Sequence, residues 1–134
     1  MSKAPGYQKY PEHKIQENKL AQRVKVEIDG NVIADSNNVI RVDEDKYPPR
    51  FYFPRADVKM NQLARSTTTT QCPFKGTANY FNLTVGNKKL DDAVWTYEDP
   101  YDEHRDLKDR VAFYDDKFSD IHVRPETSRA NALP

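Results

Sequence analysis

This 134-residue chain has no excess charge of either sign, a single cysteine and no long apolar run. Lys plus Arg and Asp plus Glu each number 21, so the formal net charge is zero. Nucleic-acid-binding domains usually carry an excess of positive charge, because releasing counterions from phosphates supplies most of their affinity. The balanced charge therefore argues against a nucleic-acid partner.

The single cysteine, Cys72, limits the chemistry further. By count alone it excludes an internal disulfide and a four-sulfur zinc site. The three histidines are widely scattered and form no HxH or HExxH pattern; they are His13, His104 and His122. A catalytic zinc needs three protein ligands within reach of one another. We therefore expect no metal site, and nothing in the sequence calls for a cofactor.

The length suits one domain that can bury a core. No stretch of about twenty apolar residues is available for a membrane span, and the first fourteen residues lack the apolar segment of a secretory signal. We expect a cytoplasmic protein without a membrane partner, and the sequence leaves homo-oligomerisation open. The expected organisation is a polar N-terminal arm over residues 1–20, a single β domain over 21–123 and a flexible C-terminal tail over 124–134.

Short strand-like segments dominate the middle of the chain. Residues 24–28 alternate apolar and polar side chains with a period of two, which is typical of a half-buried strand, and Asp29-Gly30 is a strong hairpin signal. Further segments of this kind follow at spacings of roughly ten residues: 32–34, 39–42, 51–53, 67–70, 80–85, 88–90, 93–97, 111–114 and 119–123. The pattern predicts a mainly β domain of about eight short strands. One or two helical turns are expected at residues 57–63, with Asp57 as the cap.

The stretch TQCPFKGTANY, residues 70–80, is the first candidate site. It lacks the G-x-x-x-x-G-K-[ST] pattern and is therefore not a phosphate-binding P-loop. Gly76 allows a tight turn, and Lys75 could hold a phosphate or carboxylate as a point charge. The alternative is a hairpin corner with a solvated lysine. Cys72 could be a nucleophile if a base lies nearby, although a lone cysteine is more commonly a small buried side chain.

Two further clusters place charged residues beside aromatic ones at strand ends. Arg55 follows an aromatic strand and could clamp an oxyanion, or it could pair with Asp57 and fasten the strand to the helical turn. Trp95 and Tyr97 fall on one face of a strand, with Glu98 at its end. Such a face is usually core, but it can also form the floor of a pocket.

Several segments, in this order, resemble successive motifs of the family called domain of unknown function 427, also labelled nucleotidyltransferase-9: DGNVIADS, PPRFYFPRADV, CPFKGTANYF, AVWTYEDP and VAFYDDKFSDIHV. The resemblance runs from about Pro11 to Val123. It implies a compact domain of the β-tent kind, related in shape to small zinc-binding tents whose cysteine pairs are lacking here. The transferase activity does not carry over, because the usual Gly-Ser followed by paired acids is not visible.

The resemblance also carries over a set of residues that stand where the family pattern has them: Tyr52, Arg55, Asp57, Cys72, Lys75, Gly76, Trp95 and Tyr97. We expect these residues to converge on one cleft that binds, and could act on, a small anionic molecule. In that arrangement Arg55 and Lys75 hold the anion, and Trp95 and Tyr97 form the floor beside Tyr52.

Catalysis in such a cleft would use Asp57 or Glu98 as acid or base, or Cys72 in a thiol-dependent reaction. The competing hypothesis is a non-catalytic interaction module in which the same residues only stabilise the fold. Arg55 would then pair with Asp57 or Glu98, and Cys72 would be buried. The sequence leaves these alternatives open.

Overall fold

The computed structural model describes residues 2–126, and the chain is mainly β, as the sequence predicts. Ten strands lie within these residues, rather than the eight or so expected: β1 (Ile15–Lys19), β2 (Val24–Ile28), β3 (Asn31–Ser36), β4 (Ile40–Glu44), β5 (Arg50–Tyr52), β6 (Leu63–Cys72), β7 (Gly76–Val85), β8 (Lys88–Tyr97), β9 (Val111–Phe113) and β10 (His122–Pro125). The helical elements are short: α1 (Gly6–Lys9), η1 (Arg55–Asp57), η2 (Met60–Gln62) and η3 (Asp102–Leu107). None of the helices among residues 2–126 is long and apolar enough to cross a membrane.

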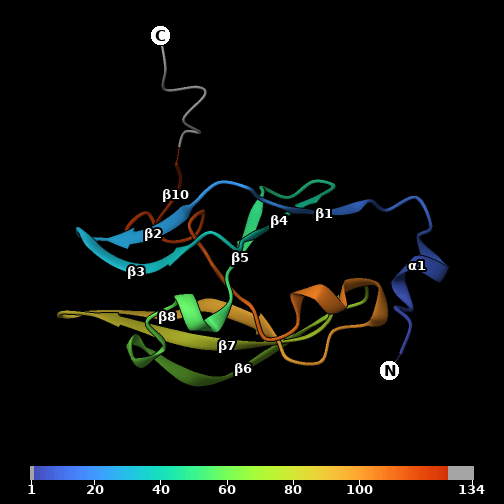
Figure 1. Cartoon of the computed structure of the whole chain (residues 1–134). Helices are drawn as coiled ribbons and strands as arrows, with labels where there is room; N and C mark the ends of the chain where they lie inside the picture. The colour runs from blue at the N-terminus through green and yellow to red at the C-terminus, as the bar shows by residue number, and fades with distance from the viewer. Residues whose placement is uncertain (1, 127–134) are drawn as a thin grey trace, which may run out of the picture.

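The strands form three antiparallel sheets with the orders β1-β4-β5, β10-β2-β3 and β6-β7-β8-β9. Phe53 and Val111 exchange two backbone hydrogen bonds of 2.8 and 2.9 Å. These bonds form one isolated bridge, which links the first sheet, just after β5, to β9 of the third sheet. The β2–β3 pair lies over the β6–β7–β8 layer, and the segment that follows β5 runs from the upper level down to the lower layer (Figure 1).

The main core fills the space between these layers. Its fully buried side chains include Ile28, Phe53, Leu83 and Val94. Burying one such side chain contributes about 1.5–3 kcal/mol relative to leaving it in water. The alternation predicted for residues 24–28 is observed, because every second residue of β2 is fully buried. The Asp29-Gly30 turn follows with φ of 51° and 80°, as the hairpin signal predicts.

A second, aromatic cluster of buried side chains sits beside this core. Trp95 and Tyr97 project into it from β8, while Val94 projects into the main core. The prediction that Trp95 and Tyr97 share one face is therefore confirmed. Tyr52 from β5 packs against both of them, with ring centroids 6.1 Å and 6.4 Å away.

The structure departs from the sequence analysis within residues 1–20. This segment is not only an arm, because β1 pairs with β4 along its full length. β1 is an edge strand whose residues are at most half-buried, so its polar composition hides the strand. The polar run 101–110 contains η3, and Leu107 of η3 is fully buried.

Three smaller expectations were also wrong. Residues 88–90 and 93–97 belong to one strand, β8, rather than two. Asp57 does not cap the helical turns, because Pro54 precedes η1 and no side chain caps it. Residues 124 and 125 belong to β10 rather than to a tail. The rest of the predicted tail, residues 127–134, lies outside the described residues.

Candidate functional site

The TQCPFKGTANY stretch forms a strand, a tight corner and a second strand. β6 ends at Cys72 and β7 begins at Gly76, and these two residues pair directly. Gly76 has φ of 121°, and a Cβ there would lie 3.3 Å from the carbonyl oxygen of Asp99, so only glycine fits without strain. The corner is therefore as predicted. The lysine at its tip is not solvated, however, because Lys75 is only 6% exposed.

Lys75 lines a cavity of about 180 Å³ over the aromatic cluster. We call this space the Lys75 cavity. It draws side chains from five strands and three loops. Its lining residues are Glu44, Tyr47, Arg50, Tyr52, Thr70, Cys72, Lys75, Tyr80, Trp95, Tyr97 and Tyr114.

One carboxylate organises the charged side of the cavity. Lys75 donates from Nζ to Oε1 of Glu44 over 2.6 Å. The other oxygen of Glu44 lies 2.8 Å from Nε2 of His13. His13 in turn stacks on Phe74, with ring centroids 4.2 Å apart. The ion pair is removed from solvent, so its attraction is stronger than that of an exposed pair.

Aromatic rings and a second cation form the opposite wall. The guanidinium of Arg50 lies 5.1 Å from the Trp95 ring and 5.2 Å from the Tyr114 ring, which are cation–π distances. Arg50 also pairs with Asp116 over 2.6 Å. The indole of Trp95 donates to the hydroxyl of Tyr52 over 3.0 Å. These contacts hold the side chains of the wall in one orientation.

Two buried tyrosine hydroxyls of the cavity, those of Tyr52 and Tyr97, remain protonated at neutral pH. Burial raises the pKa of Tyr52 and of Tyr97 well above the ordinary value. The hydroxyl of Tyr80 lies 2.9 Å from Oγ1 of Thr70 and 3.4 Å from the hydroxyl of Tyr114. The cavity therefore offers hydroxyl groups as well as two cations to a ligand.

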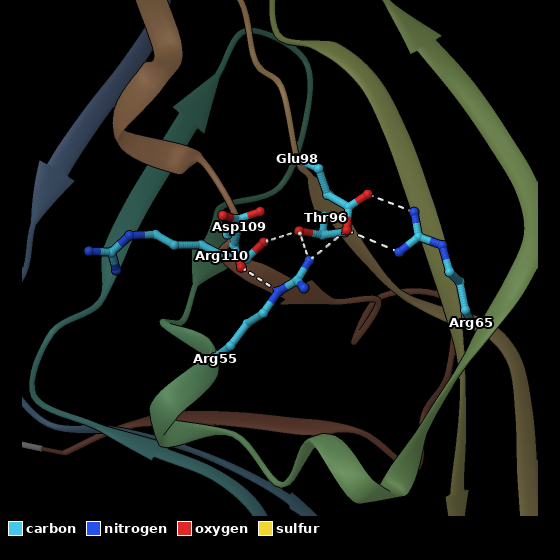
Figure 2. Close-up of polar contacts among 6 residues, drawn as sticks. All are labelled: Arg55, Arg65, Thr96, Glu98, Asp109 and Arg110. Carbon is cyan, nitrogen blue, oxygen red and sulfur yellow. Dashed lines mark hydrogen bonds and ion pairs between the residues drawn. The ribbon is translucent and has the colours of Figure 1, made fainter.

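Arg55 and Glu98 lie outside this cavity, in a second cluster shown in Figure 2. Glu98 accepts from Arg65 over 2.6 and 3.0 Å, and from Arg55 over 3.2 Å. Arg55 also donates to Thr96 Oγ1 over 3.1 Å and to the backbone oxygen of Asp109 over 2.7 Å. We call Arg55, Arg65, Thr96 and Glu98 the Arg55 cluster.

The two arginines determine the charge state of Glu98. Hydrogen bonds from Arg65, and then from Arg55, lower the pKa of the Glu98 carboxyl from 4.5 to about 2. An ionised carboxylate held by two guanidinium groups fastens three elements together: η1, β6 and the end of β8. This is the arrangement expected if Arg55 stabilises the fold.

Asp57 lies in neither group. Its Oδ2 accepts a 2.6 Å hydrogen bond from the hydroxyl of Ser36, which itself accepts from the backbone N–H of Asn38. Arg55 and Asp57 diverge because residues two apart in a 3₁₀ turn are rotated by about 240° around its axis. Of the two partners expected for Arg55, the structure thus selects Glu98.

The Lys75 cavity therefore collects five of the predicted site residues: Tyr52, Cys72, Lys75, Trp95 and Tyr97. Cys72 is half-buried. Among residues 2–126 no group of three or more His, Cys, Asp or Glu side chains is arranged to hold a metal ion.

One known family matches most of the chain. The family model described as domain of unknown function (DUF427) matches residues 16–124. The chain belongs to this family. None of the curated proteins compared with the chain matches it. All lining residues of the Lys75 cavity, from Glu44 to Tyr114, fall within the matched region, whereas His13 and α1 precede it.

Sequence reasoning missed several lining residues. Tyr80 could have been found, because it lies directly opposite Trp95 in the β7–β8 pairing and directly opposed residues share a face. Glu44 and Arg50 gave no such signal. Glu44 stands in a charged run just after the predicted strand 39–42, and its partner Lys75 is 31 residues away.

Proposed function

We propose that this protein binds a small anionic molecule in the Lys75 cavity, with Lys75 and Arg50 as the cationic contacts. The observation that carries the proposal is the burial of Lys75, which is 6% exposed and lines a cavity that also receives Arg50. A lysine is rarely buried unless it is paired. Lys75 is paired with Glu44 and Arg50 with Asp116, and of these two carboxylates Glu44 alone lines the cavity. The lining itself therefore carries one positive charge in excess, which an anion would balance.

The walls support the same interpretation. Ligand sites are typically apolar and aromatic, with a few fixed polar groups that orient the ligand. Tyr52, Trp95 and Tyr97 supply the floor, and Arg50 is held in place by its two ring contacts. Since a water molecule occupies about 30 Å³ in the liquid, 180 Å³ accommodates a group the size of a phosphate or a small carboxylate.

Besides its tyrosines and Arg50, the cavity is lined by three ionisable side chains, those of Glu44, Lys75 and Cys72. Asp57 and Glu98, expected from the sequence as acid or base, do not line it, and the proposal gives them no part in binding. For Arg55 we propose a stabilising role instead of a ligand contact, because its donors are directed at Glu98, Thr96 and the backbone. The β-tent architecture, the cytoplasmic location and the absence of a nucleic-acid partner stay predictions.

A thermal-shift screen tests the proposal. The purified protein is heated with nucleotides, sugar phosphates and small carboxylates, each with and without Mg²⁺. A ligand at a hundred times its Kd adds about 2.7 kcal/mol to the free energy of unfolding, which raises the Tm by several degrees for a domain of this size. A panel without any shift would contradict the proposal and favour the interaction module.

Variants then locate the binding site. Lys75→Ala should abolish the shift, whereas Lys89→Ala, which removes an exposed lysine near Asp91, should leave it unchanged. Because Lys75→Ala leaves Glu44 buried without its partner, the double variant Lys75→Met with Glu44→Gln is measured beside it. This variant removes both charges together and avoids an unpaired one.

A further inference from the structure

One aromatic side chain at the Lys75 cavity is exposed rather than buried. Tyr47 lines the cavity yet is 60% exposed. The other large hydrophobic side chain that is exposed among residues 2–126, Tyr10, does not line the cavity. An isolated exposed tyrosine needs no explanation by itself. Its place at the rim of a charged cavity is what makes Tyr47 informative.

The backbone that carries Tyr47 is well anchored. The N–H of Tyr47 donates to the carbonyl of Glu44 over 3.1 Å, which closes a turn directly after β4. Asp45 exchanges two hydrogen bonds with the backbone of Lys14, of 3.1 and 3.0 Å. Pro48 and Pro49 follow, and each proline has a fixed φ. The ring is thus presented on a defined turn beside Glu44, the partner of Lys75.

The size of the cavity gives the second argument. Its 180 Å³ is below the range of about 300–1,000 Å³ usual for drug-sized ligands. A ligand that fills it with an anionic group has little room inside for a ring. Any larger part of the same molecule would extend to the rim, where Tyr47 offers an unpaired aromatic face.

We propose that the ligand carries a planar ring next to its anionic group, as an aryl or heterocyclic phosphate or carboxylate does. The anionic group binds Lys75 inside the cavity, and the ring stacks on Tyr47 at the rim. This inference rests on the proposed function and adds the chemical class of the ligand. Tyr47 is then the residue that determines specificity for a ring.

The test compares two probes that differ in the ring: phenyl phosphate and methyl phosphate. Trp95 is the single tryptophan of the chain and lines the cavity, so its fluorescence reports binding at this place. Both probes are titrated at equal ionic strength into the wild-type protein, Tyr47→Phe and Tyr47→Ala. Tyr10→Ala is the control for loss of an exposed tyrosine elsewhere.

We expect phenyl phosphate to bind the wild type roughly three- to tenfold more tightly than methyl phosphate, the range that an aromatic pair supplies. Tyr47→Phe and Tyr10→Ala should keep this preference. Tyr47→Ala should remove it without changing the Kd of methyl phosphate.

Equal Kd values for the two probes in the wild type, or a preference that survives Tyr47→Ala, would overturn the inference and leave the proposed function standing. If neither phosphate binds the wild type, both the inference and the proposed phosphate-sized anion site fail.

Discussion

Lys75 and Glu44 form an ion pair of 2.6 Å that is largely withdrawn from solvent: counting side-chain atoms alone, Lys75 is 8% and Glu44 13% exposed. The pair connects the β6–β7 corner to the end of β4, and it places the ammonium group of Lys75 at the cavity. Its two members have opposite relations to an anionic ligand. Lys75 would attract the proposed ligand, whereas Glu44 would compete with that ligand for the same cation.

The first prediction follows from this competition. Glu44→Gln should lower the free energy of unfolding by roughly 3 kcal/mol, because removing one partner leaves a buried cation without its counter-charge. The same variant should bind phosphate more tightly than the wild type does. Denaturant unfolding measures the first effect, and the phosphate dependence of the Tm measures the second. Glu12→Gln, at an exposed position, is the control. A Glu44→Gln protein with weaker phosphate binding would contradict the assignment of Lys75.

The second prediction separates the Arg55 cluster from the cavity. Arg55→Ala should cost roughly 1–3 kcal/mol of stability, because it removes one of the donors to Glu98 and the donors to Thr96 and the Asp109 carbonyl. It should leave the Kd of phosphate unchanged within error. Urea unfolding and a phosphate titration followed by Trp95 fluorescence measure the two quantities. A protein of normal stability with lost anion binding would restore Arg55 as a ligand contact.

The third prediction concerns acid. The folded protein holds the pKa of Glu98 at about 2, below the ordinary value of 4.5, chiefly through its hydrogen bonds from Arg65. A lowered pKa in the folded state contributes stability that is fully present above about pH 4.5 and is lost as the pH falls towards 2. Glu98→Gln should therefore show a shallower decline of unfolding free energy between pH 4.5 and 2. Asp91→Asn, which changes a mostly exposed carboxylate, is the control. Parallel declines for the wild type and Glu98→Gln would refute this account of the cluster.

The strands that the sequence predicts well are those with one buried face. In β2 the alternation of apolar and polar residues matches the alternation of buried and half-buried residues. The sequence pattern therefore predicts both the strand and its buried face. The Cys72–Gly76 corner could also be predicted from the sequence, because proline and glycine constrain the backbone locally. The shared face of Trp95 and Tyr97 follows from the period of a strand.

The missed features depend on contacts between distant segments. β1 has no apolar alternation, because it is a sheet edge without a fully buried face. Glu44 contacts Lys75 because the fold brings β4 next to the β6–β7 corner, although the two residues are 31 positions apart in the sequence. Likewise the choice of Glu98 rather than Asp57 as the partner of Arg55 depends on how η1 meets the end of β8. No local pattern in the sequence encodes such approaches.

The central claim, that an anion binds in the Lys75 cavity, is tested most directly at Cys72. It is the single cysteine of the chain and lines this cavity, so one alkylation event reports on one place. The rate of modification by iodoacetamide, a neutral reagent, is followed by mass spectrometry with and without phenyl phosphate, at constant ionic strength. The account predicts that phenyl phosphate at ten times its Kd slows alkylation about tenfold, and that the protection disappears in Lys75→Ala. An alkylation rate that stays constant while phenyl phosphate raises the Tm would place the anion elsewhere on the protein and contradict the account.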